Sequence, residues 1–228
     1  MSALADRLSE VHHRISVACT SAGREANSVQ LIIVTKNHPS QLVLDLMDLG
    51  ESRFGENKDQ EASLKALAVA EANTSNKPVW HFVGQLQSNK VRSMLNYASV
   101  LHSLDRTSLV KELAKQLAKE PSKKLQVFIE LNLTNDPGRG GVNPDNLLAF
   151  AEEVLAVEQL ELLGVMGVAG LEALPEEEFQ RIAESAQKLQ TLAPKARFIS
   201  AGMSGDFETA IAYGATHIRV GTAITGKR

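Results

Sequence analysis

Residues 31–36 read Leu-Ile-Ile-Val-Thr-Lys, a short β-branched run that ends in a lysine. Runs of this kind are typical of a strand that is covered on both faces, as in a parallel sheet. Pro39 follows the run, where it suits the first turn of a helix. The apolar side of that helix is expected to come from Leu42, Leu46 and Leu49. The stretch therefore predicts one unit of a strand followed by a helix.

The same alternation of strand and helix continues to the end of the chain. The other predicted strands are residues 52–54, 79–83, 99–102, 125–131, 162–166, 197–200 and 217–220. The predicted helices between them are residues 57–71, 87–96, 106–119, 144–156, 175–192 and 206–213. Strands that are separated by helices pair in parallel through right-handed crossovers.

These units predict an α/β fold, a single (β/α)₈ TIM barrel that occupies residues 1–228 as one domain. An open doubly wound sheet is the rival architecture, but no Gly-x-Gly-x-x-Gly follows the first strand. An extra helix precedes the barrel, because apolar residues recur at spacings of four and three from Leu4 to Ala22, just before Gly23.

Composition and charge argue against several classes of protein. The 24 basic and 27 acidic residues give a net charge of -3, so no overall positive field attracts nucleic acid or an anionic membrane. A single cysteine, Cys19, cannot form an internal disulfide, which is typical of a reducing compartment. His12 and His13 point about 100° apart on a helix and do not form a metal pair. We predict a cytoplasmic protein with no metal, nucleic acid or membrane partner.

The active site of such a barrel is expected in the loops that follow the strands. Lys36 lies at the mouth of an apolar strand, where a lysine can lose hydration, have its pKa lowered and attack a carbonyl. A lysine that merely points into solvent is the alternative.

Two glycine-containing loops near the end of the chain suit a phosphate. Residues 200–206 open a helix, so backbone N–H groups and the Ser204 hydroxyl are available to an anion. Residues 219–223 form the second loop, and phosphate binding between the loops after strands seven and eight recurs in these barrels. Arg219 shares a strand face with Gly221 and is expected to point inward, to a phosphate or to a ring nitrogen.

A reactive lysine and a phosphate site at one barrel mouth have two chemical interpretations. One is a lysine aldolase that acts on a sugar phosphate, and the other is a pyridoxal 5′-phosphate (PLP) site. The residues by themselves leave this choice open.

Six segments resemble the PLP homeostasis proteins, which are similar to the barrel domain of alanine racemase. The segments are residues 34–36, 54–61, 80–90, 103–106, 201–206 and 218–222. The third, which reads Trp-His-Phe-Val-Gly-Gln-Leu-Gln-Ser-Asn-Lys, is the most specific. The resemblance implies that Lys36 holds PLP as an internal aldimine.

The resemblance also implies roles for further residues. Ser204, Gly221 and Thr222 would hold the phosphate, and Arg219 would face the pyridine nitrogen. A cation at that position disfavours protonation of the nitrogen and weakens the ring as an electron sink. The other residues that the resemblance places around the cofactor are Ser200, Met203, Asn57, His81 and Met166.

Several positions depart from the pattern of that family. They are Ala201, the pair Lys58 and Asp59, Thr225, and the charge-preserving Asp136 and Arg139. These changes concern local packing and surface contacts more than the lysine or the phosphate loops.

The resemblance implies a protein of PLP homeostasis that has no catalytic residue and no robust turnover. We expect a monomer, because the second domain that supplies the partner surface of racemase dimers is expected to be absent. The expected partners of the protein are PLP, amino acids and apo-enzymes that receive PLP. The alternative is a PLP-dependent amino-acid racemase, which needs a second acid or base that alanine racemase takes from a C-terminal β-domain. The chain ends at Arg228, just after the eighth strand, so we expect that domain to be absent. An aldolase without a cofactor is the third hypothesis.

Overall fold

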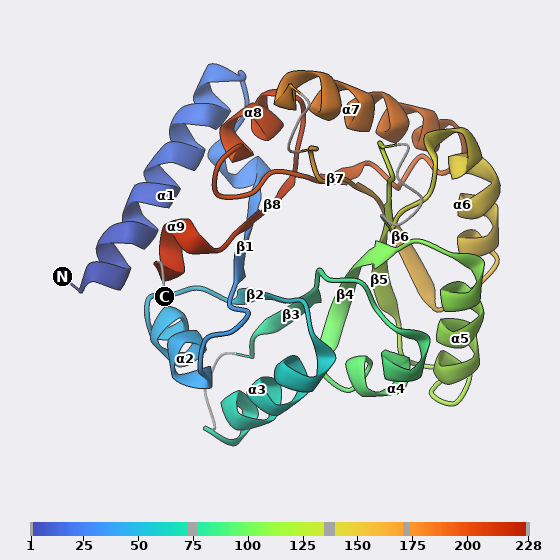
Figure 1. Cartoon of the computed structure of the whole chain (residues 1–228), viewed down its shortest axis with the longest axis horizontal. Coiled ribbons are helices and arrows are strands. Elements are labelled where there is room, and N and C mark those ends of the chain that lie inside the picture. Colours follow the sequence, from blue (N-terminus) through green and yellow to red (C-terminus); the bar gives the residue numbers. More distant parts are fainter. Residues whose placement is uncertain (1, 73–76, 135–139, 171–173, 227–228) are drawn as a thin grey trace.

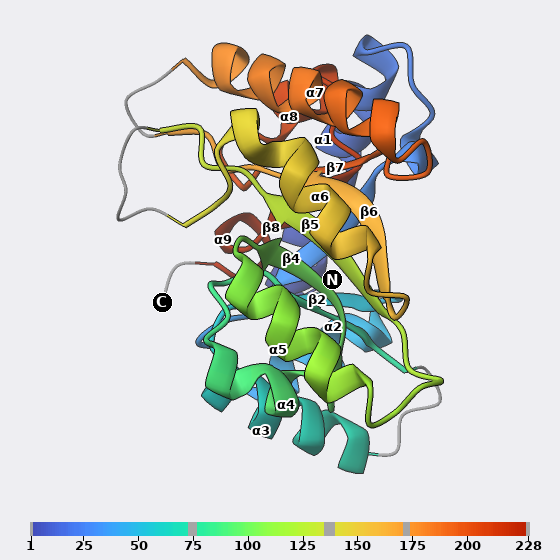
Figure 2. The ribbon, with the colours of Figure 1, turned by 90° about the vertical axis from the view of Figure 1, so that its right-hand side faces the viewer.

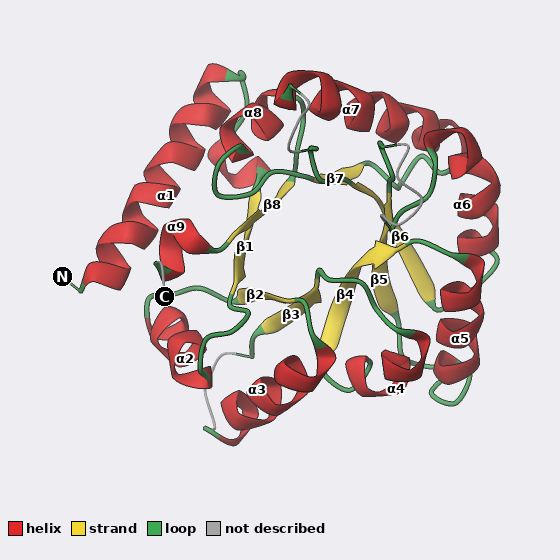
Figure 3. Cartoon of the chain, in the orientation of Figure 1, coloured by secondary structure: helices red, strands yellow, loops and turns green. Residues whose placement is uncertain are grey.

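The computed structural model describes residues 2–72, 77–134, 140–170 and 174–226. Eight parallel strands, β1 to β8, pair in chain order and close into one barrel. Helices surround this barrel on the outside (Figures 1 and 3). The predicted (β/α)₈ TIM barrel is therefore confirmed, and the open doubly wound sheet is excluded.

All the strands expected from the sequence are present, with ends shifted by at most two residues. Their bounds are β1 Gln30–Val34, β2 Arg53–Glu56, β3 Val79–Phe82, β4 Ala98–Leu104, β5 Leu125–Glu130, β6 Leu160–Met166, β7 Phe198–Ser200 and β8 His217–Val220. The middle of β1 is apolar and buried, at Leu31, Ile32 and Ile33.

The helices of the outer layer follow the strands in turn. They are α2 Ser40–Asp48, α3 Asp59–Glu71, α4 Val91–Met94, α5 Thr107–Leu117, α6 Leu147–Leu155, α7 Pro175–Leu192 and α8 Phe207–Ala212. Short 3₁₀ turns, η2 Ser88–Lys90 and η3 Pro144–Asn146, replace the predicted first turns of α4 and α6. Figure 2 shows α5, α6 and α7 along the outside of the barrel. None of the described helices is long and apolar enough to cross a membrane.

The predicted apolar side of α2 is partly wrong. Leu46 is buried, but Leu49 is 42% exposed at the end of the helix. Val43 and Met47 are buried with Leu46, because these three positions share one face at spacings of three and four residues.

The N-terminal helix, α1 Ala3–Ser21, completes the outer layer. In the described residues after β8, the chain forms the short helix α9 Thr222–Thr225, which has four residues. α1 packs against α8 and α9 and lies outside the edge where β8 meets β1 (Figure 1). Its buried side consists of Leu8, Val11, Ile15 and Cys19. The helix predicted as an addition to the barrel therefore fills a place that α9 is too short to occupy.

Polar contacts attach this first segment to the last part of the chain. The Nε of Arg7 donates to the carbonyl oxygen of Ile224 across 2.6 Å. Arg24 follows α1 and donates to the carbonyl oxygens of Ile211 and Ala215, each across 2.8 Å. Charge-assisted bonds of this kind to backbone carbonyls stabilise a fixed docking of α1.

Replacing Ile15 by alanine should test how far the barrel depends on α1. Ile15 is 6% exposed, so Ile15→Ala should lower the free energy of unfolding by about 2–4 kcal/mol. Val17 on the same helix is 51% exposed, and Val17→Ala should change it by less than about 0.5 kcal/mol. Urea unfolding followed by circular dichroism measures both values. Equal losses in the two variants would show that α1 does not pack as described.

Candidate functional site

The pairing of the first and last strands brings the predicted lysine beside the last predicted phosphate loop. β1 and β8 are in register from Gln30 opposite His217 to Ile33 opposite Val220. A cavity of about 310 Å³ lies where the two strands end. Its lining residues are Val34, Lys36, His38, Gly221, Thr222, Thr225 and Gly226. Lys36 is exposed in this cavity, so the expectation that it loses its hydration is wrong for this structure.

The loops after β7 and β8 meet at Ser204. Its Oγ accepts hydrogen bonds from the backbone N–H of Gly221 at 3.3 Å and of Ala223 at 3.4 Å. A hydroxyl and two N–H groups therefore converge beside the cavity that contains Lys36. Such a set of donors suits a phosphate, which accepts several hydrogen bonds.

The turn that carries Ser204 is held by local contacts. Asp206 Oδ1 accepts from the N–H of Met203 across 2.6 Å. Gly202 has φ +91°, and a Cβ at this position would lie 2.7 Å from the Cβ of Ala210. Only glycine fits there without displacement of α8. Met203, which the resemblance places near the cofactor, is 40% exposed.

A chain of buried polar side chains crosses the interior of the barrel. Arg219 on β8 points inward, as predicted, and its Nη2 donates to the carbonyl oxygen of Gly167 at 3.0 Å. Its Nη1 donates to Ser200 Oγ on β7 across 2.6 Å. Ser200 Oγ lies 2.8 Å from His102 Nδ1 on β4, and His102 Nε2 lies 2.9 Å from His81 Nδ1 on β3. The predicted residues Arg219, Ser200 and His81 thus belong to one hydrogen-bonded chain.

Arg219 donates to Ser200 Oγ, because a guanidinium can only donate, whereas the roles of the ring nitrogens depend on the tautomers of His102 and His81. In the arrangement that gives the Ser200 hydroxyl an acceptor, this hydroxyl donates to Nδ1 of His102. A neutral His102 donates from Nε2 to Nδ1 of His81, which leaves the N–H on Nε2 of His81. That Nε2 is buried and has no hydrogen-bond partner. We therefore assign an N–H donor to Nε2 of His81. No group in the described part of the chain accepts a hydrogen bond from it.

Burial sets the charges along this chain. It lowers the pKa of His81 to about 3 and that of His217 to about 4, with help from nearby cations. The pKa of His102 lies well below its usual value, also because of burial. Burial lowers the pKa of Arg219 to about 10, although Glu130 and Asp206 oppose the shift. At neutral pH the histidines are therefore neutral and the arginine is cationic.

Two other predicted residues lie on the second and sixth strand ends. Asn57 follows β2, and its buried Oδ1 has no hydrogen-bond partner. The loop after β3 packs on it, since a Cβ at Gly84 would lie 2.3 Å from the carbonyl oxygen of Asn57. Met166, at the end of β6, is buried in an apolar cluster with Phe128 and its neighbours. The structure places both residues among the strand ends.

The residues that depart from the family pattern lie partly in the core and partly on the surface or in the cavity. Ala201 is buried in the main core. Lys58 is exposed just before α3, whereas Asp59 is buried and accepts from the hydroxyl of Tyr97 at 3.3 Å. Thr225 lines the cavity and donates to the carbonyl oxygen of Gly221 at 3.3 Å. Asp136 and Arg139 lie outside the described residues.

The sequence did not reveal two features of this region. The place of His102 between Ser200 and His81 depends on contacts between distant strands, and no local pattern indicates it. A buried lysine, Lys65, also bonds to the backbone carbonyl of Thr35, just before Lys36. Lys65 follows Glu61 by four residues, and this spacing on a helix indicates an ion pair.

Comparisons with known proteins agree with this geometry. The alanine racemase N-terminal domain family matches residues 7–228. The pyridoxal phosphate homeostasis protein of Mycobacterium tuberculosis (strain ATCC 25618 / H37Rv) is 35% identical and aligns with 100% of this chain and 96% of its own. The protein of the same name from Escherichia coli (strain K12) is 34% identical, with coverages of 100% and 98%. The structure of PipY from Synechococcus elongatus PCC7942 with PLP bound has a TM-score of 0.84 and 32% identity, over 98% of this chain and 100% of that chain.

The buried histidines predict a loss of stability in acid. Each has a pKa below the unfolded value of 6.5, so the unfolded state binds a proton that the folded state does not. Their contribution to stability is present above pH 6.5 and is lost as the pH falls toward about 4. The free energy of unfolding changes by at most about 1.4 kcal/mol per pH unit for each histidine.

Substitution of His81 should reduce this slope. The His81→Gln variant keeps an acceptor for His102 and removes one titrating group. The free energy of unfolding is measured with urea at several pH values between 4.5 and 7.5. It should depend less on pH in the variant than in the unaltered protein. His12→Gln is the control, because His12 pairs with Glu51 on the surface and its pKa is raised by that contact. An unchanged slope in His81→Gln would contradict the buried neutral assignment.

Proposed function

Because the chain belongs to the alanine racemase N-terminal domain family, and within it to the pyridoxal phosphate homeostasis proteins, we propose that it binds PLP and serves in PLP homeostasis. The observation that carries the proposal is the cavity in which Lys36 lies beside Gly221 and Thr222. This cavity combines an amine that can bond to an aldehyde with a loop that can bind a phosphate.

The residues around the cavity fit the cofactor. Its volume of about 310 Å³ lies within the range of small-molecule sites. The Ser204 hydroxyl and the N–H groups of Gly221 and Ala223 provide donors for a phosphate. Buried polar atoms of Asn57 and His81 have no hydrogen-bond partner and are available to a polar ring. The donor set thus matches a phosphorylated aldehyde with polar ring substituents.

Each group has a defined task in this proposal. PLP supplies an electrophilic aldehyde and an electron-accepting ring when it is bound. Lys36 bonds covalently to the aldehyde carbon through Nζ. Ser204, Gly221 and Thr222 hold the phosphate, and Arg219 faces the pyridine nitrogen. The remaining wall is formed by Asn57, His81, Met166, Ser200 and Met203.

We further propose that the protein stores or delivers PLP without robust turnover. Arg219 remains cationic at neutral pH, since burial lowers its pKa only to about 10. A cation opposite the pyridine nitrogen keeps that nitrogen unprotonated, so the ring stabilises a carbanion poorly. Four further points stay predictions: the transfer of PLP to apo-enzymes, the exchange with amino acids, the monomeric state and the cytoplasmic location.

A racemase-like PLP enzyme is the second candidate. The match to the alanine racemase N-terminal domain favours it, because the barrel that would hold the cofactor is shared. Rapid formation of a D-amino acid from an L-amino acid by the PLP-loaded protein would establish this candidate and overturn the proposal of weak turnover.

The Lys36→Ala variant tests the covalent attachment. After incubation with PLP and reduction with borohydride, the unaltered protein should carry one pyridoxyl phosphate group on the peptide that contains Lys36. The variant should lose this modification, because no amine remains at that position. Tryptic digestion and mass spectrometry identify the modified residue, and Lys58→Ala is the control for an exposed lysine nearby. If the Lys36→Ala variant carried the same amount of pyridoxyl phosphate on one other lysine, the assignment would be refuted.

The Ser204→Ala variant tests the phosphate site. Loss of one hydrogen bond to a charged group weakens binding by about 1.5–3 kcal/mol, or roughly ten- to hundredfold. A titration with PLP followed by visible absorbance should show this weaker affinity, while covalent attachment at saturation persists. Ser9→Ala, on the exposed face of α1, should bind as the unaltered protein does. Equal affinities of Ser204→Ala and the unaltered protein would exclude this loop as the phosphate site.

A further inference from the structure

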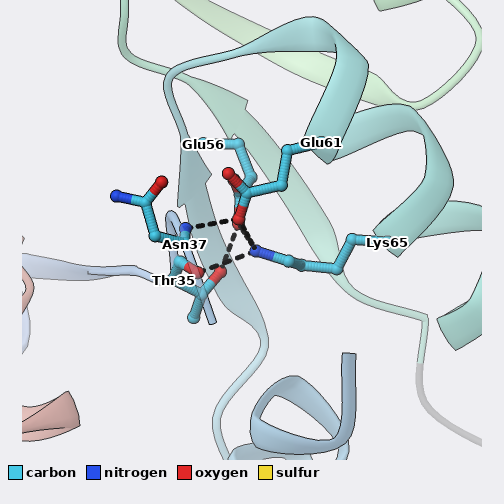
Figure 4. A network of polar contacts seen from close by, with 5 residues as sticks. All are labelled: Thr35, Asn37, Glu56, Glu61 and Lys65. Carbon is cyan, nitrogen blue, oxygen red and sulfur yellow. Dashed lines mark hydrogen bonds and ion pairs between the residues drawn. The ribbon is translucent and has the colours of Figure 1, made fainter. Parts of the chain in front are cut away.

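A buried ion pair lies beside the backbone of Lys36, among residues that the proposed cofactor site does not use. Lys65 Nζ on α3 donates to Glu56 Oε1 at the end of β2 across 2.6 Å. The two side chains are 4% and 0% exposed. Glu61, one helical turn before Lys65, accepts a second bond from the same Nζ across 2.9 Å. Figure 4 shows the three side chains converging on one point.

The remaining bonds of this cluster reach the two residues that flank Lys36. The carbonyl oxygen of Thr35 accepts from Lys65 Nζ across 2.7 Å, and Thr35 Oγ1 donates to Glu56 Oε1, also across 2.7 Å. The backbone N–H of Asn37 donates to Glu61 Oε1 (Figure 4). The ammonium group of Lys65 thus has three acceptors for its three donors. The cluster holds the chain on both sides of Lys36.

Asn37 adopts a backbone conformation that needs this support. Its φ is +63°, the one positive value outside glycine in the described part of the chain. Asparagine tolerates the left-handed region better than most residues, but it does so at some cost. The bond from its N–H to Glu61 favours this conformation, which turns the chain sharply just after Lys36.

We propose that Lys65, Glu56 and Glu61 form a positioning cluster that fixes the backbone at Lys36 and directs its amine into the cavity. The inference rests on the proposed function, in which Nζ of Lys36 forms a bond to the aldehyde carbon of PLP. The aldehyde oxygen leaves as water with the two hydrogens of the neutral amine, so no oxidant or reductant is required. Correct orientation of the amine accelerates such a step, and small displacements slow it by large factors.

The energetics of the cluster agree with a role in positioning. Burial raises the pKa of Glu56, and hydrogen bonds from Lys65 and Thr35 oppose that shift. A buried ion pair is weak evidence for a gain in stability, because desolvation offsets much of the attraction. A supported geometry at a reactive residue is a recognised use of such a network.

The rate of covalent PLP attachment to Lys36 is the test. Glu61→Ala removes the acceptor for the N–H of Asn37, and its side chain is 27% exposed, so folding should tolerate the change. We expect at least about tenfold slower attachment, measured by absorbance and by borohydride trapping at timed intervals. Glu61→Gln retains the acceptor oxygen and should react within about threefold of the unaltered protein, a difference of less than 0.7 kcal/mol.

Lys65→Met tests the same cluster from its centre. It removes the bonds to Thr35 and Glu56 together, and we again expect at least about tenfold slower attachment in the folded protein. Lys58→Met makes the same chemical change at an exposed position before α3 and should leave the rate unchanged. Removal of one partner from a buried pair is strongly destabilising. If Lys65→Met does not fold, the two Glu61 variants decide the question.

A second ligand separates positioning from general damage to the site. Pyridoxine 5′-phosphate has the same phosphate and ring but an alcohol in place of the aldehyde, so it binds without a bond to Lys36. Its affinity, measured by calorimetry, should be unchanged within about threefold in Glu61→Ala. Parallel losses of this affinity and of the attachment rate would overturn the inference, as would an unchanged rate. Failure of the unaltered protein to attach PLP would instead refute the proposed function.

Discussion

The hydrogen-bonded pairing of β1 with β8 is the constraint on which the rest of the structure depends. Parallel strands that pair in chain order form a closed surface only when the last strand reaches the first. That closure places the end of β1, with Lys36, beside Gly221 and Thr222 after β8. The same edge must be covered on the outside, and α9 is too short to do so. α1 covers it by packing against α8 and α9.

Closure also determines what fills the interior. Side chains that point inward meet across the barrel, and a buried polar group needs a hydrogen-bond partner there. Arg219 has acceptors in Ser200 and the carbonyl of Gly167, and the chain continues through His102 to His81. The arginine can only donate, and donation from the Ser200 hydroxyl to His102 sets the polarity of the rest of the chain. The consequence is an unpaired donor on His81 of β3.

The sequence predicts the elements well because each strand and helix has a local signal. A β-branched run marks β1, and Pro175 stands at the first turn of α7 as predicted. The sequence predicts fewer of the contacts between these elements. His102 and Ser200 are 98 residues apart, and their contact depends on the registers of several strand pairs. At Gly164 a Cβ would lie 1.8 Å from the carbonyl oxygen of Phe198, a close approach of two strands that no local pattern indicates.

The site around Lys36 combines two kinds of support that differ in strength. On the side of β8, the backbone N–H groups of Gly221 and Ala223 offer long hydrogen bonds that a ligand can replace. On the side of β2 and α3, short bonds from a buried ammonium and two carboxylates leave little freedom to Thr35 and Asn37. The buried charges thus bond to the residue just before Lys36, and the neutral donors belong to the loop after β8 that lines the same cavity.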